Sequence, residues 1–407
     1  MKKLLIIGAV WPEPNSTAAG KRMLQIISIF KDLNYEITFC STASKSEHSF
    51  DLNFLNISSE NILLNDSSFD DFVKKFQPDV VLFDRFMTEE QFGWRVAENV
   101  PNATKILDTE DLHFLRKQRE IDFKSEEENT SQKEISDTFI REISSILRCD
   151  LSLIISDFEQ NLLIEKYKIN PEILYYLPMF SEKFKGEIPG FQERKNFMHI
   201  GNFLHEPNWQ TVLILKKLWK SIKQKLPDSE LHIYGSYVTE KAKQLHNEKE
   251  GFIIKGRANS VEEVFLNYKV LLARIPFGAG IKGKLLESME FGLPNITTEI
   301  GAEGIQFDEN WNGFITKSDE EFIEKSINLY SVSSIWENSQ KIGFEILDKK
   351  FKRNLFEQGF IERIQSLSEN LESHRNENYL GKILQQNALQ STKFMSKWIE
   401  EKNKKLK

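Results

Sequence analysis

The segment PFGAGIKGKLLESMEFGLP at residues 276–294, followed by TTEIGAEG at residues 297–304, decides the fold of this chain. It predicts the end of a strand, a glycine-rich turn, a short helix, a glycine stop and a new strand. Gly278, Gly280 and Gly283 remove side chains where backbone amides must approach another group closely. The N-terminus of the short helix would point its unpaired N–H groups back into this turn.

Two lysines and a carboxylate complete the chemistry of the turn. Lys282 and Lys284 add positive charge beside the helix N-terminus, and Glu287 follows further along the same helix. This combination is typical of a pocket for a diphosphate with a hydroxyl-rich group beside it. An ordinary strand–helix turn with solvated lysines has the same spacing, so both interpretations stay open at this point.

The length and composition of the chain narrow the classes of function. At 407 residues it is long enough for about two to three domains with sizeable cores. Its net charge of −7 argues against nucleic acid as the main partner. Cys40 and Cys149 match no metal or disulfide pattern, which favours a reducing compartment. We interpret residues 4–10 as a buried strand and not a signal peptide, because the apolar run is short and Pro12 and Pro14 follow it.

Strands and helices alternate twice along the chain, which predicts an α/β protein of two Rossmann-like domains facing each other across a cleft. The first alternation begins with the strand at 4–10 and the second with a strand at 197–201. A polar connector at 181–195 separates them. We therefore expect an N-terminal domain over residues 1–185 and a C-terminal domain over residues 186–370.

Residues 371–407 are expected to form an amphipathic helical tail with a basic end. Apolar residues recur at helical spacing from Leu380 to Ile399, and Lys402 and Lys404 follow. Such a segment can pack on its own protein, pair with a second chain or lie on an anionic membrane surface. Packing within the protein is the commoner outcome, and no run approaches the roughly 20 apolar residues of a membrane-spanning helix.

Two polar loops that follow expected strands are further candidates for a site. The loop DTEDLH at 108–113 holds three carboxylates and a histidine, which packing alone explains poorly, although solvation or helix capping would also account for it. Arg116 and Arg119 are placed to clamp this acidic loop. The loop GNFLHEPN at 201–208 precedes a helix whose N-terminus is another anion site, and its His205 could equally be structural.

Several common motifs are missing from the sequence. Gly20 and Lys21 are not part of a phosphate-binding P-loop, because Asn15 replaces its first glycine and Arg22 its Ser/Thr. The first strand does not lead into G-x-G-x-x-G, which removes support for dinucleotide binding. Neither a zinc-ligand spacing nor a G-x-S-x-G nucleophile elbow occurs.

Taken together, these segments resemble the GT-B glycosyltransferases, and more narrowly their retaining family 4-like group, the glycosyl transferases group 1. The resemblance rests on PFGAGIKGKLLE (276–287), GLP (292–294), TT (297–298) and GAEG (301–304), supported by GNFxHxPN (201–208) and Gly235. It covers roughly residues 1–370, is specific in the C-terminal half and is only architectural near the N-terminus.

The resemblance implies a nucleotide-diphosphate sugar as donor substrate on the C-terminal domain and an acceptor on the N-terminal domain, with no cofactor. In the family a Glu-x7-Glu pair frames the donor: the first glutamate touches the sugar and the second holds the ribose hydroxyls. Glu287 matches the second position, whereas Ala279 stands at the first, and Asn202 stands where an arginine is usual. We expect Lys282 to supply the missing positive charge, so that no metal is required.

The residues expected to act follow from the same resemblance. The expected donor-binding residues are Gly201, Asn202, Gly235, Arg257, Gly278, Gly280, Ile281, Lys282 and Glu287. The expected catalytic residues are Asp108, His113 and Lys282, with Glu110 and Asp111 also reaching the cleft. The implied reaction retains the anomeric configuration, because the leaving diphosphate itself helps to deprotonate the acceptor on the same face.

The implied function is a glycosyltransferase that moves a sugar onto a glycan or lipid-linked acceptor in cell-surface polysaccharide or glycoconjugate biosynthesis. A cytoplasmic location, with contact to the inner face of the membrane through the tail, agrees with this. Two alternatives remain open. One is a non-catalytic GT-B relative that binds nucleotide or a partner transferase, favoured by Ala279 and Asn202. The other is a GT-B-fold nucleotide-sugar epimerase that uses the carboxylates of the loop 108–111.

Overall fold

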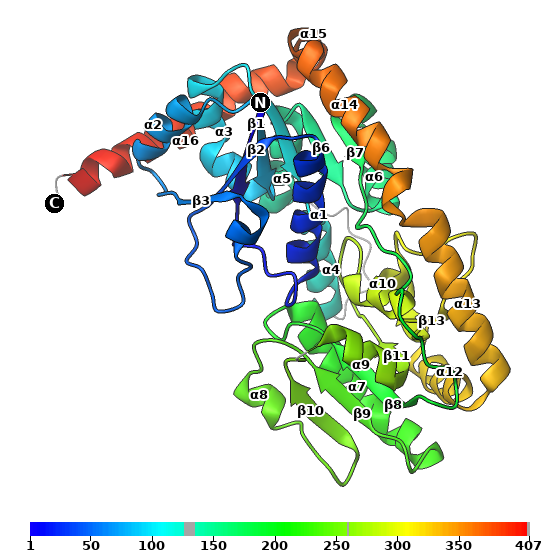
Figure 1. The fold of residues 1–407 in the computed structure, drawn as a ribbon. Coiled ribbons are helices and arrows are strands. Elements are labelled where there is room, and N and C mark those ends of the chain that lie inside the picture. The colour runs from blue at the N-terminus through cyan, green and yellow to red at the C-terminus, as the bar shows by residue number, and fades with distance from the viewer. Residues whose placement is uncertain (126–134, 259, 405–407) are drawn as a thin grey trace.

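The computed structural model describes residues 1–125, 135–258 and 260–404, which form two α/β domains (Figure 1). Within these residues each domain is built on one parallel sheet. The first sheet has seven strands in the order β3-β2-β1-β4-β5-β6-β7, and the second has six in the order β10-β9-β8-β11-β12-β13. The prediction of two Rossmann-like domains in a GT-B arrangement is confirmed.

The first domain opens with the strand that the sequence predicts. Leu4 to Ile7 of β1 are fully buried, because β1 lies between β2 and β4 and helices cover both faces of the sheet. The strands are β1 (Lys3–Gly8), β2 (Glu36–Ser41), β3 (Ser58–Asn61), β4 (Val80–Asp84), β5 (Thr104–Asp108), β6 (Leu151–Ile154) and β7 (Leu174–Tyr176). The helices are α1 (Ala18–Asp32), α2 (Ser68–Phe76), α3 (Phe86–Asn99), α4 (His113–Ser125), α5 (Asp137–Arg148) and α6 (Asp157–Asn161).

The second domain contains the glycine-rich segment 276–294. β11 ends at Ala273, the glycine-rich turn follows, and α10 leads into β12, as the sequence predicts. The strands are β8 (Lys195–Ile200), β9 (Leu231–Tyr234), β10 (Phe252–Gly256), β11 (Tyr268–Ala273), β12 (Asn295–Thr298) and β13 (Gly313–Thr316). The helices are α7 (Glu206–Lys225), α8 (Glu240–Lys243), α9 (Val261–Asn267), α10 (Gly283–Glu290), α11 (Glu299–Ala302), α12 (Asp319–Ser331) and α13 (Ser333–Lys350).

The chain then returns to the first domain, which corrects the expected boundary at residue 370. Helix α14 (Glu357–Glu369) packs Phe360, Ile364 and Leu367 into the core beneath β1 and α1. Figure 1 shows α14 and the short α15 (Leu371–Glu377) rising from α13 along the first domain. Sequence order could not reveal this crossing, because the amphipathic pattern of α14 does not say which core receives it.

The tail forms the long helix α16 (Tyr379–Lys404), which packs on α3 and α5 of the first domain. Packing within the protein, the commoner of the expected outcomes, is therefore observed for one side of this helix. Residues 405–407 of the expected tail lie outside the described residues. None of the described helices is long and apolar enough to cross a membrane.

Candidate active site

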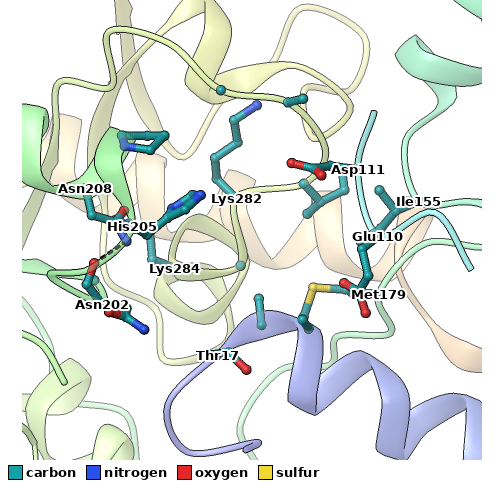
Figure 2. A pocket seen from close by; sticks show the side chains of 18 of the residues that line it. Thr17, Glu110, Asp111, Ile155, Met179, Asn202, His205, Asn208, Lys282 and Lys284 are labelled. Carbon is teal, nitrogen blue, oxygen red and sulfur yellow. Dashed lines mark hydrogen bonds between the residues drawn. The ribbon is translucent and has the colours of Figure 1, made fainter. Parts of the chain in front are cut away.

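A cavity of ≈ 500 Å³ lies between the two domains, at the carboxyl ends of both sheets. The first domain lines it with residues 14–19 before and at the start of α1 and with residues from the loops after β4 and β5. The second domain lines it with the loops after β8 and β11 and with the start of α10. In Figure 2, Lys282 and Lys284 of the second domain lie opposite Glu110, Asp111 and Met179 of the first.

Two helix N-termini meet in this cavity. Thr17 caps α1 by accepting a hydrogen bond from the Gly20 amide, and Ala18 and Ala19 of its first turn line the cavity. A Cβ built on Gly283, at the start of α10, would lie only 2.8 Å from the Cβ of Ala18. The close approach of the helices depends on this glycine. The N–H groups in the first turn of each helix have no carbonyl partner within their own helix. Both helices direct these N–H groups toward the same space.

Two lysines with lowered pKa values flank these helix ends. Burial lowers the pKa of Lys282 to about 8, against the opposing charges of Glu303 and Glu159. Burial also lowers the pKa of Lys284 to about 7, with Glu287 opposing. The Nζ of Lys284 donates to Oδ1 of Asn208 at 2.7 Å. An anion in the cavity would stabilise both ammonium groups, because buried charge without a full counter-charge is unfavourable.

Glu287 lies where the donor-site expectation puts it, on the wall of the cavity. Lys21 of α1 reaches it from the first domain at 3.7 Å and bonds Glu290 at 3.1 Å. Burial raises the pKa of Glu287 above its ordinary value, and Lys21 opposes that shift. Its carboxyl group lies in the cavity lining together with Lys282 and Lys284, where it can meet the hydroxyl groups of a ligand.

Asp108 does not reach the cavity, which corrects its expected catalytic role. Its side chain is fully buried and accepts two hydrogen bonds from Nε of Arg22 and one from Nη2, at 2.8–3.1 Å. Arg22 also donates to the carbonyl of Leu177 at 2.5 Å. This ion pair holds the end of β5 against α1. Asp108 therefore positions the start of the acidic loop and does not contact the cavity.

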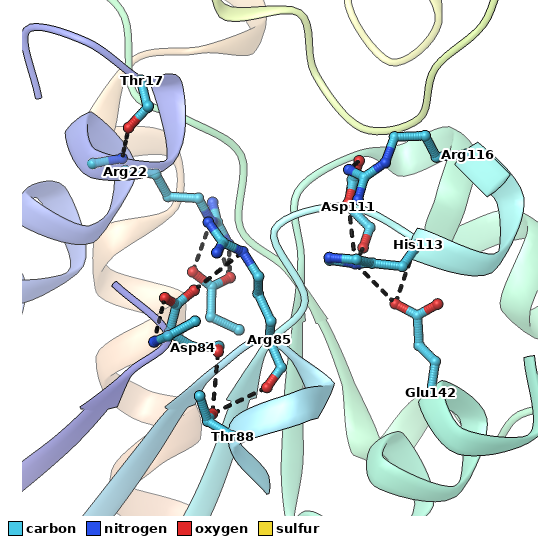
Figure 3. Close-up of polar contacts among 12 residues, drawn as sticks. Thr17, Arg22, Asp84, Arg85, Thr88, Asp111, His113, Arg116 and Glu142 are labelled. Carbon is cyan, nitrogen blue, oxygen red and sulfur yellow. Dashed lines mark hydrogen bonds and ion pairs between the residues drawn. The ribbon is translucent and has the colours of Figure 1, made fainter. Parts of the chain in front are cut away.

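The remainder of the acidic loop does line the cavity. Glu110, at φ 62°, and Asp111 follow the turn after β5, and His113 begins α4, whose first-turn amides donate to Glu142. The Nδ1 of His113 lies 3.1 Å from the carbonyl oxygen of Asp111. Figure 3 shows Arg116 and His113 on the two sides of Asp111. Burial raises the pKa of Glu110 well above its ordinary value, and Asp108 and Asp84 raise it further.

The two expected arginine clamps have different partners. Arg116 forms an ion pair with Asp111, as the sequence suggests. Arg119 instead bonds the second domain: Nη1 donates to the carbonyl of Gly278 at 2.8 Å, and both Nη atoms donate to Glu303 at 2.6 and 2.7 Å. Glu159 of α6 adds a second link, since its Oε1 accepts from Leu112 at 3.1 Å and from the Gly280 amide at 2.8 Å.

The remaining expected donor residues divide into two groups. The following line the cavity: Gly201, Asn202, Gly278 and Ile281. Three expected residues are not among the described residues that line it: Gly235, Gly280 and Arg257. Gly235 packs against the loop after β8, where a Cβ would lie 2.1 Å from the carbonyl of Gly201, and the Gly280 amide is already bonded to Glu159. The exposed Arg257 lies on the surface beyond β10.

Lys284, which is not among the expected donor-binding residues, lies over the loop after β8. A Cβ on Gly201 would lie 2.8 Å from Nζ of Lys284 and 2.6 Å from Cγ of Asn208, so the lysine occupies the space over this glycine. Lys284 thereby brings positive charge to the loop in which Asn202 replaces the expected arginine. Its position in the segment 276–294 indicated that it lies near the anion-binding turn. Only the fold shows which of the two lysines reaches the loop after β8. Burial, with Arg116 acting in the same direction, lowers the pKa of the neighbouring His205 to about 4.

Among the described residues no group of three or more His, Cys, Asp or Glu side chains could hold a metal ion. Positive charge in the cavity comes from lysine, arginine and helix ends. This arrangement can hold a doubly charged diphosphate and a hydroxyl-bearing group at the same time.

Comparisons with known proteins show relatives of this fold. Residues 194–331 match the family model described as glycosyl transferases group 1. No curated protein matches the chain in sequence. Among solved structures, a glycosyltransferase from Rickettsia africae superposes with a TM-score of 0.68 at 13% identity, covering 91% of this chain and 99% of the other.

Two further structures were determined with ligands. Anabaena HepE, in complex with UDP and glucose, has a TM-score of 0.65 at 14% identity, with 90% of this chain and 100% of the other covered. A mutant of S. aureus TarM, in complex with fondaparinux, α-GlcNAc-glycerol and UDP, has a TM-score of 0.56 at 14% identity. That match covers 74% of this chain, which spans 58% of the TarM chain. At these identities the likeness shows the shared fold.

Proposed function

Because residues 194–331 match the family model described as glycosyl transferases group 1, we propose that this chain is a retaining glycosyltransferase that uses a nucleotide-diphosphate sugar. The observation that carries the proposal is the meeting of α1 and α10, N-terminus to N-terminus, with Lys282 and Lys284 beside them. A diphosphate bound there would receive amide donors from both domains and charge from both lysines. Anabaena HepE, which has this fold, was solved with UDP and glucose.

The proposed reaction needs stabilisation of the leaving group more than it needs a base. The bond between the anomeric carbon and the phosphate oxygen breaks, and the nucleoside diphosphate leaves with the electron pair. The acceptor hydroxyl forms its bond on the same face of the sugar and passes its proton to the departing phosphate. Lys282, Lys284 and the two helix ends would stabilise the charge that develops on this phosphate.

The two domains would divide the substrates between them. Glu287 would accept hydrogen bonds from the ribose hydroxyls on the second domain, and His113 would orient the sugar from the first. The acceptor would enter beside Arg85 and Met87, which line the cavity on the first-domain side. A glycan or lipid-linked acceptor in cell-surface polysaccharide or glycoconjugate synthesis fits such a site.

A panel of nucleotide-sugars tests the proposal. The protein is incubated with UDP-, GDP- and TDP-sugars, and hydrolysis, epimer formation and thermal shift are measured. Slow hydrolysis of one donor with release of the nucleoside diphosphate is expected. If no nucleotide or nucleotide-sugar shifts the melting temperature, the proposed function is wrong.

A non-catalytic nucleotide-binding relative is the second candidate, and Ala279 and Asn202 are the observations that favour it. Nucleotide binding without turnover, in the presence of candidate acceptors, would support it. Formation of an epimer would instead indicate the nucleotide-sugar epimerase, with the raised pKa of Glu110 making it the acid/base candidate.

We also propose that α16 contacts an anionic membrane surface. Its inner side buries Ser396 against Arg95, whereas the aromatic side chains of Tyr379, Phe394 and Trp398 are 61–63% exposed. The lysines Lys397 and Lys402 are exposed on the same helix, and aromatic and basic side chains together favour a lipid interface.

Co-sedimentation with vesicles of phosphatidylcholine, with and without phosphatidylserine, tests this contact. Phe394→Ser combined with Trp398→Ser should lower binding to the anionic vesicles by about tenfold or more. Leu355→Ser, which also removes an exposed apolar side chain, should leave binding unchanged. If light scattering shows a dimer that the double variant loses, the helix pairs with a second copy instead.

A further inference from the structure

One residue that lines the cavity, Ala279, offers no hydrogen-bond acceptor through its side chain. It lies in the glycine-rich turn between Gly278 and Ile281, which also line the cavity. Its methyl group cannot accept a hydrogen bond, although a sugar presents several hydroxyl groups that need acceptors when they leave water. The inference that follows rests on the proposed function.

Asp111 of the first domain lies against Gly280, the residue that follows Ala279. A Cβ built on Gly280 would lie only 2.8 Å from the Cβ of Asp111 and 3.3 Å from the carbonyl oxygen of Glu110. Gly280 has φ +63°, so a larger residue is disfavoured by both space and conformation. Asp111 and Ala279 line the same cavity, from opposite domains and next to the same glycine.

The position of Asp111 is fixed by contacts on both sides of the interface. Glu159 accepts from the amides of Leu112 and Gly280 with one oxygen, so it ties the residue after Asp111 to the residue after Ala279. Arg119 joins α4 to Gly278 and Glu303. The acidic loop and the glycine-rich turn are therefore held together while the domains are closed.

The two carboxylate oxygens of Asp111 have different partners. Oδ2 pairs with Arg116, whereas the buried Oδ1 accepts no hydrogen bond from the described residues. Nδ1 of His113 lies 3.2 Å from Oδ1, with which it pairs when protonated, and 3.1 Å from the Asp111 carbonyl oxygen. A buried acceptor without a hydrogen bond costs free energy, and a ligand hydroxyl that reaches Oδ1 would recover it.

Asp111 is also held in its charged form. Burial acts to raise its pKa, but Arg116, His113 and His205 outweigh this and lower the pKa below its ordinary value. Hydrogen bonds from hydroxyl groups to an ionised carboxylate are stronger than those to a neutral acceptor.

We propose that Asp111 reaches across the domain interface to bind a hydroxyl of the donor sugar, replacing the carboxylate that Ala279 cannot provide. The sugar would then be held by the first domain and the nucleotide by the second. As a consequence, a nucleotide-sugar should favour domain closure more strongly than the same nucleotide diphosphate without its sugar.

Asp111→Asn and Asp111→Ala test the proposal, by titration calorimetry with the nucleotide-sugar found active in the panel and with its nucleoside diphosphate. Affinity for the nucleoside diphosphate should stay within about twofold, while affinity for the nucleotide-sugar falls about tenfold in Asp111→Ala. Hydrolysis of the donor should fall more steeply still. Asp137→Asn, an exposed aspartate at the start of α5, is the matched control.

Equal losses of affinity for both ligands would show a structural role for Asp111 and overturn the proposal, as would unchanged sugar binding and hydrolysis. Failure of the wild-type protein to bind any nucleotide would instead contradict the proposed function. Asp111→Asn keeps the size of the side chain and guards against misfolding of Asp111→Ala.

A rescue experiment separates the proposed role from general damage. Adding Ala279→Glu to Asp111→Ala should raise the rate of donor hydrolysis about tenfold or more above that of Asp111→Ala alone. The reason is that the new carboxylate enters the same part of the cavity. The double variant could instead hydrolyse the donor no faster than Asp111→Ala while still binding the nucleoside diphosphate. That result would contradict the idea that a carboxylate at position 279 can replace the one at position 111.

Discussion

At the scale of single residues, the site depends on buried cations that have incomplete partners. Lys282 bonds the carbonyl of Gly280 and Lys284 the side chain of Asn208, so each Nζ keeps donors for a ligand. The sequence pointed to Lys282, and the structure adds Lys284 over Gly201. Two lysines from one turn can thus bind a diphosphate, although Asn202 stands where a charged arginine was expected.

We predict that Lys284→Gln weakens binding of the nucleoside diphosphate by about 10- to 100-fold, since hydrogen bonds to charged groups contribute about 1.5–3 kcal/mol. Lys282→Ala should lower both binding and turnover by a similar factor. Titration calorimetry and donor hydrolysis measure the two effects. Lys217→Gln, an exposed lysine of α7, should match the wild type, and full turnover in Lys282→Ala would end its catalytic role.

The lowered pKa values predict how binding depends on pH. Lys284 and Lys282 lose their protons near pH 7 and 8 in the free protein, and a bound diphosphate favours the protonated forms. Affinity should therefore fall as the pH rises from 7 to 9, by up to about tenfold per pH unit for each lysine. Calorimetry in buffers of different ionisation enthalpy should detect proton uptake. Constant affinity over this range would contradict the prediction.

At the scale of elements, the helices after α13 belong to the first domain. Phe360 of α14 is fully buried and meets Phe30 of α1 edge-on, with ring centroids 6.0 Å apart. Tyr175 of β7 packs on the same ring, with ring centroids 5.5 Å apart. Helix α14 therefore ties the last part of the chain to the helix that begins at the cavity.

We predict that Phe360→Ala lowers the stability of the first domain by about 3–5 kcal/mol, the usual cost of removing a buried phenylalanine side chain. Urea denaturation followed by tryptophan fluorescence would detect the loss. Phe54→Ala, at a side chain 81% exposed, should change stability little. If the two variants unfold at the same urea concentration, α14 does not stabilise the first domain as described.

At the scale of the whole molecule, polar contacts hold the two domains closed. Arg119 joins Gly278 and Glu303, and Lys350 of α13 bonds Asp157 of α6 at 2.7 Å. These links are ionic and partly solvated, so they permit the domains to separate for substrate exchange. Closure brings α1, α10 and the acidic loop together.

We predict that Arg119→Ala opens the molecule, because it removes contacts to both Gly278 and Glu303 from one side chain. Small-angle scattering should show a larger radius of gyration, and nucleotide-sugar affinity should fall by about tenfold if closure is needed to grip the sugar. Arg274→Ala breaks an ion pair with Asp319 inside the second domain and serves as the control. An unchanged radius with unchanged affinity would show that Arg119 is not a latch.

Much of the fold could be predicted because its signals are local. The buried strand at the N-terminus, the alternation of strands and helices, and the glycine-rich turn before α10 follow from periodicity and turn chemistry. The candidate site was predictable only in part. Glu287, Lys282 and His113 do line the cavity, whereas Asp108 is held by Arg22 and Gly280 by Glu159.

Local sequence patterns are enough to predict a two-domain α/β protein with an anion-binding turn in its second half. They do not predict that Asp111 rather than Asp108 faces the cavity, that Lys284 covers Gly201, or that α14 returns to the first domain. Local patterns record the period and caps of each element, but a partner across the domain interface is set by how the two sheets pack.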